Sequence, residues 1–65
     1  MHDPDIFAIL EQLRIDIALA TATNYRALQQ TVLLAAANGL EKEPLYWDAI
    51  SRLEALQAVS TLYHN

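Results

Sequence analysis

The strongest helix stop in the chain is the segment AAANGLEKEP, residues 35–44, and it constrains the fold more than any other feature. Asn38 and Gly39 can adopt the left-handed conformation that ends a helix, and Pro44 can begin the next one. Between Pro4 and Gly39, neither proline nor glycine interrupts the sequence. The sequence therefore predicts two helices joined by a short turn over residues 38–43.

The first helix has a favourable start at Asp3 and Pro4. Asp is a preferred N-cap, and proline at the first helical position lacks an N–H that would be unpaired in any case. We expect this helix over about residues 4–37, which corresponds to about 50 Å, and a second helix over about 44–63, about 30 Å long. Short connections favour antiparallel neighbours. The expected fold is all-α, a single 1–65 domain in which a long and a shorter helix form an antiparallel hairpin.

The unequal helix lengths predict apolar surface that one hairpin cannot cover. The second helix should reach back only to about residues 15–19, which leaves the first three turns of the first helix bare. A chain of 65 residues buries only about 60% of its unfolded surface, and without cysteine it cannot form disulfides. We therefore expect a symmetric homodimer, a four-helix bundle. Its interface is expected to contain Ile6, Leu10, Leu13, Ile17, Asn24 and Leu28.

Thr21 and Asn24 interrupt the apolar stripe of the first helix. One interpretation is that Asn24 forms a buried polar pair across the two-fold axis, as a core Asn does in coiled coils. The other is that Asn24 lies at the edge of the stripe, half in water. The expected bundle resembles the Rop-type RNA-binding dimer in architecture, although the two share no residue motif.

A second, thinner apolar line on the first helix includes Ile15 and Leu19. Aromatic residues with a polar group are enriched in binding hot spots. Tyr25 belongs to the first expected helix, and Trp47 lies outside the core stripe of the second helix. That stripe contains Tyr46, Ala49, Ile50, Leu53, Leu56, Ser60 and Tyr63. The candidate partner-binding residues are therefore Trp47, Tyr25, Leu19 and Ile15. Alternatively, Trp47 caps the end of the bundle near the turn.

Catalytic and metal-binding patterns are missing from the sequence. There is no cysteine, His2 and His64 lie at opposite ends, and none of the carboxylates forms a Glu-x-x-His pair. We expect no histidine within reach of Ser51 or Ser60, and catalysis needs positioned groups in a cleft. We expect no enzyme activity, no metal site and no cofactor.

The charge is -4, with only four Lys and Arg residues. Nucleic-acid binding relies on such cations, so this balance argues against it. No apolar run approaches the roughly 20 residues of a membrane span, and the acidic N-terminus does not resemble a secretory signal. The expected location is therefore the cytoplasm.

These expectations favour a non-enzymatic protein–protein interaction module that presents a rigid apolar and aromatic patch. By analogy of size, it would be a phage or mobile-element inhibitor or adaptor of a larger bacterial protein. The alternative is a small helical-bundle regulator that contacts RNA or DNA. A third interpretation is a subunit that stabilises a larger complex.

Overall fold

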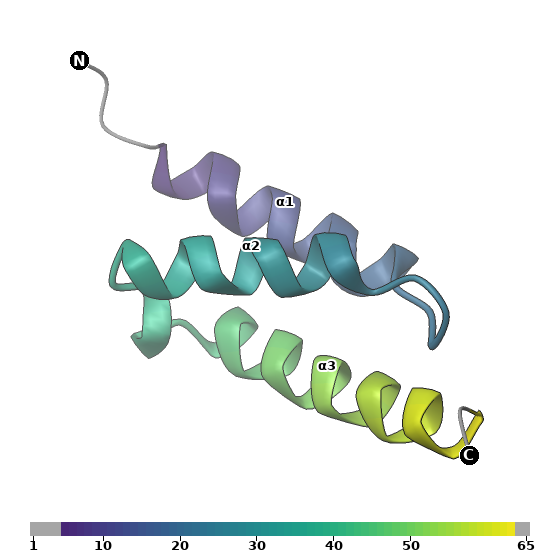
Figure 1. Ribbon diagram of the computed structural model, residues 1–65. Helices are drawn as coiled ribbons and strands as arrows, with labels where there is room; N and C mark the ends of the chain where they lie inside the picture. Colours follow the sequence, from purple (N-terminus) through teal and green to yellow (C-terminus); the bar gives the residue numbers. More distant parts are fainter. Residues whose placement is uncertain (1–4, 64–65) are drawn as a thin grey trace.

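The computed structural model describes residues 5–63, with side chains described through Leu62. This part of the chain forms three α-helices and one short 3-10 helix, which are α1 (Ile6–Leu19), α2 (Arg26–Ala37), η1 (Leu40–Lys42) and α3 (Pro44–Tyr63). The chain runs along α1, returns along α2 and runs out again along α3 (Figure 1), and each α-helix contacts the other two. The all-α prediction is confirmed, whereas the two-helix hairpin is wrong.

The helix predicted over residues 4–37 is broken at residues 20–25. α1 ends at Leu19, and Ala20 is already extended, with φ -68° and ψ 140°. Thr21 and Asn24 then exchange two backbone N–H···O bonds of 3.1 Å each, which close a tight turn. Threonine loses side-chain freedom in a helix, and Asn competes for backbone hydrogen bonds, so both residues favour such a break. The two polar residues that interrupt the stripe therefore mark a turn.

The ends of the helices have local explanations. Asp5 is the N-cap of α1, and its side chain accepts a 2.9 Å hydrogen bond from the Phe7 N–H. The predicted start at Asp3 and Pro4 lies outside the described residues. At the other stop, Gly39 adopts a left-handed φ of 74° directly after α2, as its position predicts. α3 then begins at Pro44 and ends at Tyr63, which are the bounds predicted for the second helix.

The core lies between the three helices and is almost entirely aliphatic. Leu13 of α1 and Leu28 of α2 are its largest fully buried side chains. Ala35 and Ala49 are also fully buried, and small residues at these positions allow close approach of the helices. The other buried apolar residues are Ile9, Ala20, Val32, Leu40, Leu53 and Leu56.

The expectation that the first three turns lack cover within the chain is wrong for Ile9 and Leu13, whereas Phe7 in the same turns is 81% exposed. Because the chain turns back at residues 20–25, α1 packs on both α2 and α3, and Ile9 and Leu13 are buried without a second chain. Leu28, also assigned to the dimer interface, is likewise a core residue of the single chain. Uncovered apolar surface at Ile9 and Leu13 therefore no longer supports a four-helix dimer, which stays a prediction.

The remaining residues assigned to the dimer interface lie at the margin of the core or outside it. Leu10 and Ile17 are half-buried and pack against the core. Ile6 is 38% exposed at the start of α1. Asn24 is exposed in the turn, so in the single chain it is not a buried polar pair.

A buried polar contact joins α1 to α2. Asp16 is only 7% exposed, and its carboxylate accepts hydrogen bonds from the Thr31 hydroxyl at 2.5 Å and from the Gln12 side-chain amide at 3.0 Å. No cation of the described residues lies within ion-pair distance of Asp16. The buried Asp16 carboxylate keeps its hydrogen bond to Thr31 only when α1 and α2 are aligned as they are here. The contact therefore favours this alignment of α1 on α2.

Replacing Thr31 with Val should test this contact. Val has the shape of Thr but no hydroxyl, so the buried Asp16 carboxylate loses a donor, and we expect a loss of about 1–3 kcal/mol in the free energy of unfolding. Thr31→Ser, which keeps the hydroxyl, is the matched control, and urea denaturation followed by circular dichroism measures both. Wild-type stability of Thr31→Val would show that the contact contributes nothing.

Candidate functional site

Large apolar side chains remain exposed on all three helices. Scattered exposed apolar residues are normal, so only those that lie together indicate a site. Within the described residues they are Ile6, Phe7, Ile15, Leu19, Leu33, Leu34, Trp47, Val59 and Leu62.

Two of these residues form a ridge on α1. Ile15 and Leu19 are four residues apart and therefore neighbours on one helix face, and they are 41% and 72% exposed. Leu19 also borders a small groove of about 160 Å³ between α1 and α2, lined further by Asp16, Ala20, Asn24, Ala27 and Leu28. We call Ile15, Leu19 and this groove the α1 outer surface. It brings together two of the four predicted partner-binding residues.

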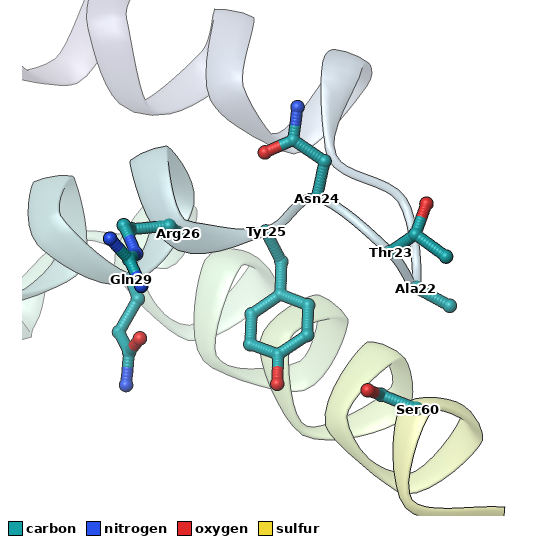
Figure 2. Close-up of a pocket in the computed structure, with 7 residues that line it drawn as sticks. All are labelled: Ala22, Thr23, Asn24, Tyr25, Arg26, Gln29 and Ser60. Atoms are coloured by element: carbon teal, nitrogen blue, oxygen red, sulfur yellow. The ribbon is translucent and has the colours of Figure 1, made fainter. Parts of the chain in front are cut away.

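Tyr25 belongs to a different and larger groove on the α2–α3 side. Figure 2 shows its ring extending from the start of α2 towards α3, with Ser60 of α3 beyond the ring. The groove has a volume of about 720 Å³ and is lined by Ala22, Thr23, Asn24, Tyr25, Arg26, Gln29 and Ser60. Tyr25 is half-buried and packs against the core. Its ring is thus a wall of the groove, and its position differs from that of Ile15 and Leu19.

The chemistry of this larger groove is that of polar contacts. Its lining offers the hydroxyls of Thr23, Tyr25 and Ser60, two side-chain amides and the Arg26 guanidinium. Among residues 5–63, the groove lining contains no histidine, cysteine or carboxylate. The groups that it does contain can hydrogen-bond a ligand.

Trp47 is held at the junction between η1 and α3. Its indole N–H donates a 2.7 Å hydrogen bond to the Glu41 carbonyl, and its ring meets Tyr46 edge-on, with centroids 5.1 Å apart and planes at 89°. The ring is nevertheless 56% exposed. This geometry matches the alternative interpretation, in which Trp47 caps the end of the bundle. Trp47 belongs to the first turn of α3, which begins near the end of α2, whereas α1 ends near the start of α2 (Figure 1).

Charged residues gather into no basic surface on the described helices. Arg14 pairs with Glu11 on the same exposed turn of α1, Arg26 lines the larger groove, and Lys42 and Arg52 lie on η1 and α3. Residues 5–63 contain no group of three or more His, Cys, Asp or Glu side chains placed to hold a metal ion. His2 and His64 lie outside this range.

Comparisons with protein families, curated proteins and solved structures found no significant match to the chain. In the part of the chain that the structure describes, no helix is both long enough and apolar enough to cross a bilayer.

The role of Trp47 can be tested by paired substitutions. Trp47→Ala removes the hydrogen bond to Glu41 and the contact with Tyr46, so we expect a loss of about 1–2 kcal/mol in unfolding free energy. Trp47→Phe should recover part of this loss, because it keeps an aromatic ring but not the N–H. Thermal unfolding followed by circular dichroism measures both. Full stability of Trp47→Ala would rule out the capping role.

Proposed function

We propose that the chain is a small protein-interaction module that binds its partner through the α1 outer surface. The observation that carries this proposal is the exposure of Leu19, which is 72% accessible although it borders a groove between two packed helices. An apolar side chain of a partner that enters this groove would contact Leu19, and the partner surface next to it would cover Ile15 on the same helix face. Exposed apolar side chains that lie together mark protein–protein interaction sites.

The inward face of α1 supports this role because it holds the helix in place. Leu13 is fully buried and Asp16 bonds to Thr31. Ile15 therefore lies between two anchored residues, and Leu19 follows the second of them by three residues. A ridge on an anchored helix loses little conformational freedom on binding, which favours affinity. The mechanism is therefore presentation of a preformed surface without a catalytic step.

The partner that fits is a larger protein with an apolar projection. The groove is small, about 160 Å³, and accommodates a single side chain rather than a ligand of drug size. Inhibition or bridging of that larger protein would follow if the projection belonged to one of its own functional surfaces. This extends the proposal to an inhibitor or adaptor.

Introduction of a negative charge on the α1 outer surface tests the proposal. Leu19→Glu should leave the fold intact, because the side chain is exposed, and should abolish capture of the partner from a lysate of the source cells. The matched control is Leu62→Glu, an equally exposed leucine at 74% on α3. Affinity capture with mass spectrometry compares the two variants with the wild-type chain.

A protein captured by the wild-type chain and Leu62→Glu but lost with Leu19→Glu is the expected result. Equal capture by all three would contradict the α1 outer surface as the site. The nucleic-acid alternative predicts a mobility shift of RNA or DNA at low salt that weakens as salt rises. Such a shift, without any captured protein, would replace the proposal.

A further inference from the structure

We propose that two copies of this chain exchange α1, with the turn at residues 20–25 opening into a continuous helix. In the exchanged dimer, α1 of each copy packs on α2 and α3 of the other. The surface of α2 and α3 that a chain covers with its own α1 in the closed form is then covered by α1 of the second copy. The observations behind this proposal differ from those behind the α1 outer surface, although Ala20 and Asn24 of the turn also line the groove of that surface.

The helical pattern continues across the break. Leu13, Ile17, Thr21, Asn24 and Leu28 follow one another at steps of four, four, three and four, which is the spacing of one helix face. α1 and α2 are therefore in phase with each other as one uninterrupted helix. A connection selected only as a turn has no reason to preserve this phase. The residues of the turn, ATATNY, include neither proline nor glycine.

Few backbone hydrogen bonds hold the turn closed. No described residue other than Gly39 has a positive φ, so Ala22 and Thr23 both have negative values. The turn is closed by only two backbone bonds, between Thr21 and Asn24, and neither of these uses the N–H of Ala22 or Thr23. A continuous helix bonds both N–H groups to carbonyls four residues earlier.

Exchange preserves the contacts of the bundle. Leu13 enters the same core and Asp16 accepts from the same Thr31 hydroxyl, now donated by the other copy. Closed and exchanged forms therefore differ mainly in the hinge and in the entropy of association, which is why exchange of an identical element is a low-cost route to a dimer. The two long helices run antiparallel about a two-fold axis at the hinge. Asn24, exposed in the closed form, then lies close to its counterpart.

Proline at position 22 separates the two forms. Ala22 is the second residue of a four-residue turn with negative φ, a position where proline is favoured, whereas proline inside a helix removes a hydrogen bond and clashes with the preceding turn. Ala22→Pro should keep the closed monomer and weaken dimerisation by at least about 1,000-fold, since each dimer contains two hinges. Ala22→Ser is the matched control, with dimerisation close to wild type.

Helix-favouring residues in the hinge should act in the opposite direction. Thr23→Ala combined with Asn24→Ala removes two residues that disfavour helix, so the dimer should strengthen by about tenfold or more. Analytical ultracentrifugation after refolding at millimolar concentration measures the dimer fraction of each variant. A mass of twice 7.3 kDa identifies the dimer.

Distances between spin labels identify exchange directly. Glu11→Cys and Ala37→Cys place labels on exposed positions in a chain that has no cysteine of its own. In the closed form these positions lie on neighbouring helices, whose axes are about 10 Å apart. In a continuous helix the same 26-residue separation spans about 39 Å. Dilution of labelled chain into excess unlabelled chain restricts the measurement to one copy.

The expected result is a dimer fraction with the long distance, depleted by Ala22→Pro and enriched by the double alanine variant. Three outcomes would overturn the proposal. One is a dimer that retains the short distance, because it would use another surface. Another is undiminished dimerisation of a helical Ala22→Pro chain. The third is a wild-type chain and a double alanine variant that both remain monomeric after refolding at millimolar concentration.

Discussion

The rest of the structure depends on the packing of α1 across α2 and α3. Two helices of this length would leave one side of each apolar stripe in water, whereas the third helix closes the core around Leu13 and Leu28. A chain of this size has little surface to bury, so the gain from one additional helix is a large share of its stability. The Asp16–Thr31 contact then favours a single alignment of that helix.

Much of the fold could be predicted from local signals. Gly39 and Pro44 mark the end of α2 and the start of α3, because left-handed backbone and a missing N–H are properties of single residues. The break at residues 20–25 could not be predicted in the same way. Its polar residues are also tolerated within helices, and the apolar spacing continues through them. Within a single chain, the burial gained when α1 folds back favours the turn over the helix, and that burial is a property of the whole chain.

The sequence indicated the relative position of two of the four predicted partner-binding residues. Ile15 and Leu19 lie together on α1 because residues four apart share a helix face, which spacing alone reveals. Tyr25 lines the larger groove together with Ser60 of α3, whereas Trp47 of α3 bonds to Glu41 of η1. Both positions depend on the turns between the helices, which spacing along one helix does not reveal. Asp16 was missed as a core residue, because a carboxylate in the sequence normally indicates a solvated position. Its place three residues after Leu13, on the edge of the apolar stripe, was the available signal.

The central claim is that one chain buries its own core. Sedimentation combined with circular dichroism over a dilution series tests it most directly. The account predicts that, at the lowest concentrations, the chain sediments as a 7.3 kDa monomer with its helicity undiminished. Helicity that falls on dilution together with the sedimenting mass would contradict it, because the core would then require a second chain.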